Sequence, residues 1–121
     1  MPAKKQELPG VELFRYFSPS RRFLVSVRDN GESWAKTSGS KWFLSFRKKD
    51  DAPYERWLAG KREKYESLPA WAKNVRSIPS AATLDKWSND GVCRTVTGDM
   101  VEPDGEGPDG APSWLVALGL I

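Results

Sequence analysis

The sequence predicts an α+β fold: a small antiparallel β-sheet of three or four strands, formed by the front half of the chain, with two or three short helices packed on one face. Apolar and polar side chains alternate between residues 21 and 49, and a period of two is that of a strand. Residues 53–67 instead place apolar side chains three and four positions apart, which is the period of a helix. Because strand-like and helix-like stretches separate along the chain instead of alternating, a βαβ plan is disfavoured.

The front half begins with residues 1–10, which have little to bury and are expected to form a flexible tail. Residues 11–17 are predicted to form a strand. Three further strands are predicted over 22–28, 32–37 and 41–48, joined by turns at 29–31 and 38–40. In the last of these strands, alternation predicts a core face with Trp42, Leu44 and Phe46 and an outer face with Lys41, Phe43, Ser45 and Arg47.

The back half is predicted to be mainly helical. A helix over residues 53–67 begins with an acidic cap and a proline in its first turn, and it ends before Pro69. A short helix can follow at 69–75, and Ser80 can cap a third helix that ends at 89–91. Strand-like residues 92–97 and 100–102 flank a turn, and Ser113 can cap one or two final turns. The apolar end of the chain is expected to be buried, either in the domain's own core or in a partner.

The length suits one domain spanning residues 1–121, and its charge is unevenly distributed. Residues 1–49 hold 11 Lys and Arg against 4 Asp and Glu, whereas residues 91–121 hold 1 against 5. This asymmetry indicates a polyanion or an acidic partner for the front half, or an attraction between the two ends of the chain within the fold.

The leading functional hypothesis is a small basic module that binds nucleic acid, DNA or RNA, without catalysis. Cations of the ribbon over residues 21–49 would neutralise phosphates, and an exposed ring would stack on a base. The residues predicted to bind are Arg21, Arg22, Arg28, Trp34, Lys36, Lys41, Phe43, Arg47, Lys48 and Lys49. The alternative interpretation of the same side chains is an ordinary solvated sheet face, whose edge Lys and Arg discourage strand-to-strand aggregation.

Enzymatic function is not predicted, because the chain has no histidine and no glycine-rich phosphate loop. The single cysteine, Cys93, leaves no internal disulfide and is expected to be a buried structural residue in a reducing compartment. A metal-dependent enzyme is the remaining catalytic alternative, with the carboxylates of Glu102, Asp104, Glu106 and Asp109. Their spacing begins like a calcium loop, but Ser113 stands where the closing glutamate is needed, so turn formation explains them better. We therefore expect no metal and no cofactor.

The second functional hypothesis is a protein-interaction module, for example a phage-encoded inhibitor that docks on a host complex. The six tryptophans, the apolar end of the chain and the lack of active-site chemistry favour it. Residues 103–121 are also similar to the ends of small proteins of bacteria and their mobile elements, which implies a phage or mobile-element origin. The longest apolar run, 114–118, is too short to span a membrane and the N-terminus lacks a signal sequence, so a cytoplasmic protein is expected.

Overall fold

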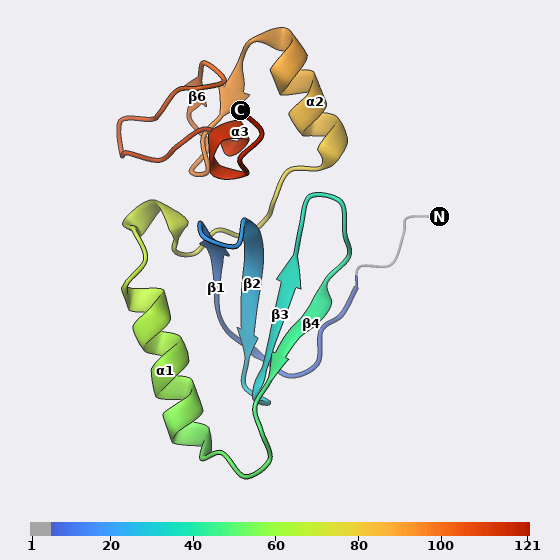
Figure 1. Cartoon of the computed structure of the whole chain (residues 1–121), viewed down its shortest axis with the longest axis vertical. Helices are drawn as coiled ribbons and strands as arrows, with labels where there is room; N and C mark the ends of the chain where they lie inside the picture. The colour runs from blue at the N-terminus through green and yellow to red at the C-terminus, as the bar shows by residue number, and fades with distance from the viewer. Residues whose placement is uncertain (1–5) are drawn as a thin grey trace.

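The computed structural model describes residues 6–121 and confirms the α+β fold. Its main layer is a four-stranded antiparallel sheet in the order β1-β2-β3-β4, so that neighbours in the chain are neighbours in the sheet (Figure 1). The strands are β1 (Glu12–Ser18), β2 (Phe23–Arg28), β3 (Glu32–Lys36) and β4 (Phe43–Arg47). The predicted opening strand and the predicted three-stranded ribbon are therefore both confirmed.

The back half of the chain forms α1 (Tyr54–Glu66), the 3-10 helix η1 (Ala70–Ala72), α2 (Ala81–Asp90), β5 (Cys93–Arg94), β6 (Met100–Val101) and α3 (Trp114–Ala117). Strands β5 and β6 pair as a second, two-stranded antiparallel sheet. Only α1 lies along the main sheet, whereas residues 80–121, here called the C-terminal unit, gather at its end (Figure 1). Helix α1 therefore covers one face of the main sheet, whereas α2 and α3 bury their apolar sides against β5 and the end of the sheet.

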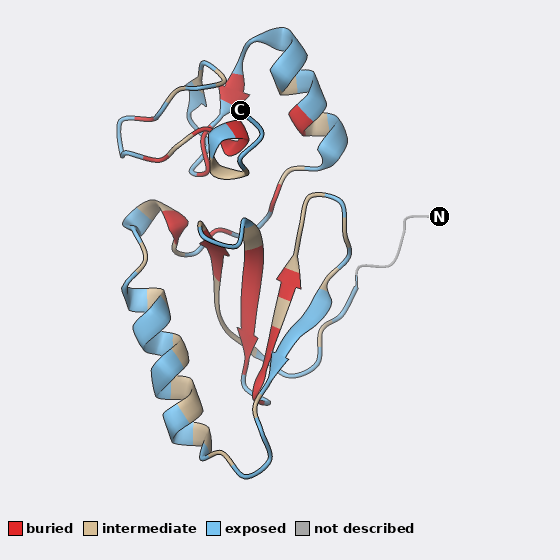
Figure 2. Cartoon of the chain, viewed as in Figure 1, coloured by how far each residue is buried: buried red, intermediate tan, exposed pale blue. Residues whose placement is uncertain are grey.

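Two clusters of buried side chains stabilise the fold, and in Figure 2 they appear as red segments of the main sheet and of the C-terminal unit. The first lies between the sheet and α1, where Tyr16, Val25 and Val27 are covered by Trp57 and Tyr65 of the helix. The second joins the sheet to the C-terminal unit, and its buried members are Phe17, Leu24, Val75, Ile78, Leu84, Cys93, Val96, Trp114 and Leu115. Of the apolar C-terminus, Trp114, Leu115, Ala117 and Leu118 thus pack into the protein's own core, whereas Val116, Leu120 and Ile121 are exposed.

The helix caps follow the local chemistry of the sequence. The Oγ of Ser80 accepts a hydrogen bond from the backbone N–H of Thr83 at 3.2 Å, and Gly91 ends α2 with a left-handed φ of 70°. In the same way, the Oγ of Ser113 accepts from the N–H of Val116 at 3.1 Å and begins α3. The predicted starts of both helices are confirmed.

Strand β4 departs from the predicted alternation. Trp34 pairs with Leu44 while Ser33 pairs with Phe46, so the register shifts between them and one residue of β4 is left over. Such a bulge interrupts the period of two. Phe43 and Phe46 consequently share the α1 side of the sheet, and the predicted division of this strand into a core face and an outer face is wrong. All five residues of β4 are exposed (Figure 2).

The segment before β1 is bound to the sheet. The side-chain amide of Gln6 donates to the carbonyl of Trp42 and accepts from its N–H, both at 3.0 Å. The guanidinium of Arg28 donates to the carbonyls of Pro9 at 3.0 Å and Gly10 at 2.7 Å. Residues 6–10 are therefore not the loose tail that the sequence predicted, and residues 1–5 of that predicted tail lie outside the described residues.

Candidate nucleic-acid interface

The ten residues predicted to bind nucleic acid do not share one surface. The antiparallel order places Arg21, Arg22 and Lys41 toward one end of the sheet, and Arg28 and Arg47 toward the other, as the strand directions imply. Their faces, however, differ. The side of the sheet away from α1 holds Arg28, Trp34, Lys36 and Arg47; the α1 side holds Phe43; and Arg21, Arg22, Lys41, Lys48 and Lys49 lie in the connecting segments. A single basic platform along the ribbon is therefore not present.

On the side away from α1, the predicted cations are largely occupied by partners within the chain. Arg28 is only 8% exposed and donates to backbone carbonyls of the segment before β1. Arg47 donates from Nε and Nη2 to Oε2 of Glu32, at 3.0 and 2.8 Å, and the indole of Trp34 donates to the other oxygen of the same carboxylate. These hydrogen bonds, with the one from Asn30, hold the pKa of Glu32 below its usual value against the opposing effect of burial. The cations Arg28 and Arg47 of this face are thus engaged by partners within the chain.

Two of the predicted lysines bind backbone carbonyls. The Nζ of Lys36 donates to the carbonyl of Ser40 at 2.8 Å and so closes the β3–β4 turn. The Nζ of Lys48 donates to the carbonyls of Lys49 and Ala52, at 2.8 and 2.9 Å, and orders the approach to α1. The geometry of both ammonium groups is therefore explained by loop structure.

The α1 side of the sheet contains a groove of a different character. Helix α1 covers β1 and β2 through Tyr65 and Trp57, and the uncovered half of this side lies between the helix and β4. The resulting cavity of about 110 Å³ is lined by Tyr16, Ser18, Arg21, Phe23, Val25, Ser33, Ser45, Phe46, Lys61 and Lys64. We call it the basic groove, because three of these side chains are cations and no described carboxylate lines it.

The three cations of the basic groove lack acidic partners. The ion pairs found among residues 6–121 involve five other basic side chains, and none involves Arg21, Lys61 or Lys64. Burial lowers the pKa of Lys61, and the positive charges of Lys64 and Arg21 lower it further. An anion that enters the groove would stabilise the charged form of Lys61, which the neighbouring positive charges disfavour. The groove is therefore a region of uncompensated positive potential.

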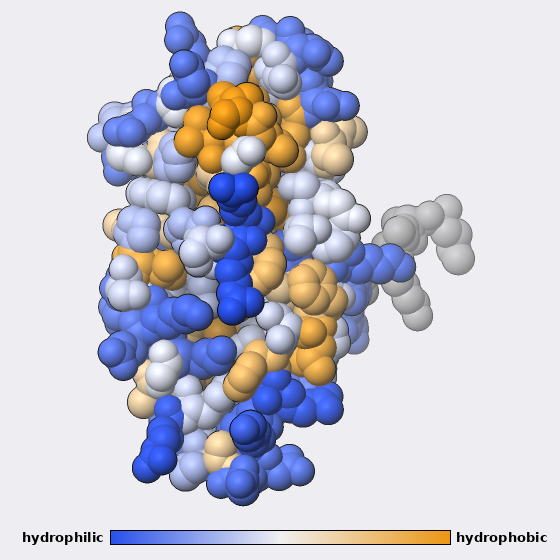
Figure 3. Space-filling model, viewed as in Figure 1, coloured by the Kyte–Doolittle hydropathy of each residue, from blue (hydrophilic) through white to orange (hydrophobic). Residues whose placement is uncertain are grey.

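Aromatic rings border the groove on its β4 side. The Nζ of Lys61 lies 4.4 Å from the ring centre of Phe46, so the lysine reaches from α1 across to β4. Phe43 meets Phe23 edge to face, with 6.2 Å between ring centres. Phe43 and Phe46 remain 40% and 45% exposed. Figure 3 shows a hydrophilic strip over β2 and the β1–β2 turn with hydrophobic surface beside it over β3 and β4.

The floor of the groove includes a buried hydroxyl without a partner. Ser33 is 2% exposed, and its Oγ makes no hydrogen bond with any described residue. A polar atom left unpaired in the interior costs about 1–3 kcal/mol, so such atoms are rare and often mark a functional position. Here the unpaired hydroxyl adjoins three unpaired cations.

Sequence reasoning identified only part of this groove. Arg21, which lines the groove, and Phe43, which borders it through Phe23, belong to the predicted set, whereas Lys61, Lys64 and Phe46 do not. The helical period offered a signal, because Lys61 and Lys64 stand three positions apart and thus share a face of α1. The bulge that turns Phe46 toward α1 has no comparable signal in the sequence.

The remaining chemical features have structural explanations. Asp109 accepts hydrogen bonds from the hydroxyl of Thr97 at 2.6 Å and from the N–H of Ala111, which hold its pKa below the usual value. Cys93 is buried in the second cluster, as expected for a structural residue. Within residues 6–121, no three His, Cys, Asp or Glu side chains converge as metal ligands, and no helix is both long and apolar enough to cross a membrane.

Comparisons with family models, with curated proteins and with solved structures found no match for this chain.

Proposed function

We propose that the protein binds single-stranded nucleic acid in the basic groove, without catalysis. One observation carries the proposal: Arg21, Lys61 and Lys64 converge without any acidic partner beside two exposed phenyl rings. Proteins that bind single strands combine these two features, a positive groove that follows the backbone and rings on which bases stack.

In this mechanism the cations hold phosphates and the rings hold bases. The cavity of about 110 Å³ admits a phosphate group with a few waters, since a water molecule occupies about 30 Å³ of the liquid. A phosphate between α1 and the β1–β2 turn would place the neighbouring bases over β4, where Phe43 and Phe46 are exposed. Only unpaired bases offer a free face for such stacking, so single strands are preferred over duplexes.

The proposal is tested by fluorescence anisotropy with labelled single-stranded and duplex oligonucleotides over a series of salt concentrations. The key variant is Lys61→Gln with Lys64→Gln. Each phosphate contact on a single strand contributes about 0.7 to the slope of log affinity against log salt, so losing two contacts should lower the slope by about 1.4. Phe43→Ala and Phe46→Ala should each weaken binding by about 1–3 kcal/mol through lost stacking.

The matched control is Lys49→Gln with Lys86→Gln, which removes the same charge from exposed positions outside the groove. This control should bind like the wild type in both affinity and salt slope. Absence of binding at low salt, or equal losses in the groove variant and the control, contradicts the proposal.

A protein partner is the second candidate, and strand β4 is the observation that favours it. This edge strand is exposed along its whole length. The backbone groups on its outer edge can pair with a strand of another chain, and Phe43, Leu44 and Phe46 add apolar contact surface. A host protein of the bacterial cytoplasm would be such a partner, and the buried, unpaired Cys93 suits a reducing compartment. Pull-downs from nuclease-treated bacterial lysate separate the two candidates: a partner that survives nuclease and is lost in Leu44→Lys favours the protein interaction.

A further inference from the structure

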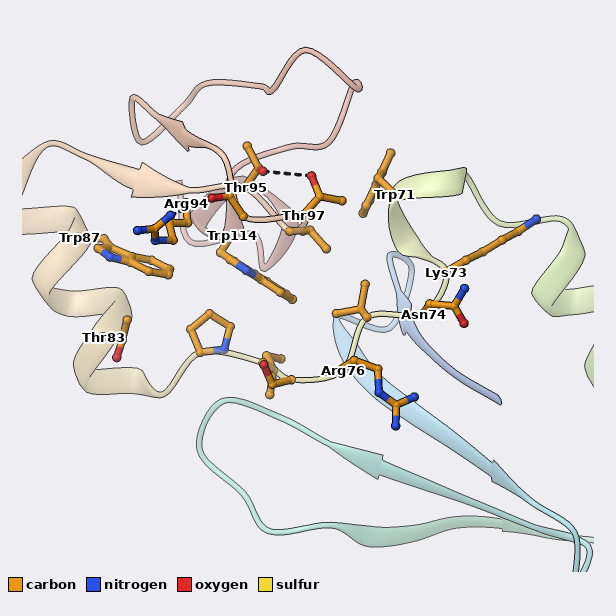
Figure 4. A pocket seen from close by; sticks show the side chains of 16 residues that line it. Trp71, Lys73, Asn74, Arg76, Thr83, Trp87, Arg94, Thr95, Thr97 and Trp114 are labelled. Atoms are coloured by element: carbon orange, nitrogen blue, oxygen red, sulfur yellow. Dashed lines mark hydrogen bonds between the residues drawn. The ribbon is translucent and has the colours of Figure 1, made fainter. Parts of the chain in front are cut away.

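A second cavity lies away from the basic groove. It has a volume of about 570 Å³ and is bordered by the C-terminal unit and by the segment that connects η1 to α2 (Figure 4). Three tryptophans from different elements line it: Trp71 from η1, Trp87 from α2 and Trp114 from α3. Cavities of about 300–1,000 Å³ are typical of small-molecule sites, and aromatic linings are common in them.

The indole rings are held in place by the core and not by one another. Trp114 is 5% exposed and meets Phe17 edge to face, with 5.2 Å between ring centres, while Trp71 lies 6.5 Å from the same ring. Of the six tryptophans, all within the described residues, only Trp34 donates a hydrogen bond from its indole nitrogen. The three cavity tryptophans therefore offer rigid aromatic faces and free N–H donors.

One cation of the cavity remains without an acidic partner. Arg76 and Lys73 line it as well, but their charged ends pair with Glu12 at 2.8 Å and Glu66 at 3.5 Å. Arg94 lies beside Trp87 (Figure 4), and one of its nitrogens is anchored by the carbonyl of Gly98 at 2.8 Å. Its other donors stay available, and no described carboxylate lines the cavity.

We propose that this cavity binds a small planar aromatic molecule that carries a negative charge. The ring would lie against the indole of Trp87, and the anion would accept hydrogen bonds from Arg94. Cations fit less well, because hard cations bind to carboxylate and carbonyl oxygens and this lining has no carboxylate. The site is separate from the basic groove and does not depend on the function proposed above.

The test uses two anionic probes, AMP and indole-3-acetate, with adenosine, indole-3-acetamide and ribose 5-phosphate as their neutral or ring-free counterparts. Binding is followed in the full-length protein by NMR of the six indole N–H signals. We expect saturable shifts of Trp71, Trp87 and Trp114, with Trp34, Trp42 and Trp57 as internal controls that do not move. Each anionic probe should bind more tightly than its counterparts.

The variant Arg94→Gln should weaken the anionic probes about tenfold or more, as expected when a charge-assisted hydrogen bond is lost, and leave the neutral ones unchanged. Trp87→Leu should weaken both classes, whereas Lys86→Gln on the same helix should weaken neither. The groove variant with Lys61→Gln and Lys64→Gln should also bind the probes normally. The inference is overturned if neither anion binds saturably, if all six signals shift alike, or if Arg94→Gln binds as the wild type does.

Discussion

Glu12 holds three guanidinium groups together on the side of the sheet away from α1. Its replacement by glutamine should lower the free energy of unfolding. Its Oε2 accepts from Nε of Arg15 and from the hydroxyl of Ser26, both at 2.7 Å, and its Oε1 lies 2.8 Å from Nη2 of Arg76. The buried Arg28 is 3.6 Å away. Glu12→Gln keeps the shape of the side chain but removes the charge that these three guanidinium groups share.

The expected loss of stability at neutral pH is about 2–3 kcal/mol. A hydrogen bond to a charged group is worth about 1.5–3 kcal/mol, and breaking a fully buried ion pair costs about 3–5 kcal/mol. Glu12 is partly accessible, with 17% of its side chain exposed, and Arg76 can turn to solvent, so the lower part of these ranges applies. Glu55→Gln, at an exposed position of α1, is the control and should cost less than about 0.5 kcal/mol.

The effect of Glu12→Gln should also depend on pH. Burial by itself would raise the pKa of Glu12, but the hydrogen bonds from Ser26, Arg15 and Arg76 outweigh burial and lower it. A carboxyl whose pKa is lower in the folded state stabilises the protein above its unfolded pKa of about 4.3, and this contribution disappears as the pH falls through the folded value. The stability difference between wild type and variant should therefore shrink in acid.

Urea unfolding followed by tryptophan fluorescence, repeated from neutral pH into acid, measures both quantities. A difference between wild type and Glu12→Gln that stays constant with pH would refute the assignment of the charge. A loss no larger than that of Glu55→Gln would refute the importance of the network.

Three further predictions concern single positions and can be checked by the same unfolding assay. Phe17→Ala should cost about 3–5 kcal/mol, because this fully buried ring joins the sheet to the C-terminal unit, and a loss below that of the exposed Phe43→Ala would contradict the described core. Ser33→Ala should stabilise the protein by about 1 kcal/mol, since it removes a buried hydroxyl that has no partner among the described residues, and destabilisation would mean that the hydroxyl is in fact bonded. Ser80→Ala should cost about 1 kcal/mol through loss of the α2 cap, whereas Ser80→Thr, which can still accept the hydrogen bond, should cost little, and equal losses would argue against capping.

Much of the secondary structure could be predicted because its causes are local. The alternation of Phe23, Val25 and Val27 indicated β2, and the serines at positions 80 and 113 marked the starts of α2 and α3. Each signal involves residues within one or two turns of each other along the chain. The α+β class followed from the order of these elements.

The candidate interface could not be predicted, because whether a charged side chain is paired depends on residues far away in the sequence. Glu12 meets Arg76 and Arg28 only once the sheet and the segment after η1 are in place, so the carboxylate beside the predicted binding residue Arg28 is set by the folded chain. The bulge in β4 likewise separates Phe46 from Leu44, with which the period of two had grouped it, and places it on the same side as Phe43.

The sequence by itself thus determined the elements, the excess of positive charge in the front half and the lack of histidine chemistry. The tertiary structure decided which cations stay unpaired, by bringing Arg21 from a turn together with Lys61 and Lys64 from a helix. The physical reason is the short range of effective charge compensation: a carboxylate neutralises a cation when it lies within a few ångströms in a poorly hydrated place, and only the folded chain sets that separation.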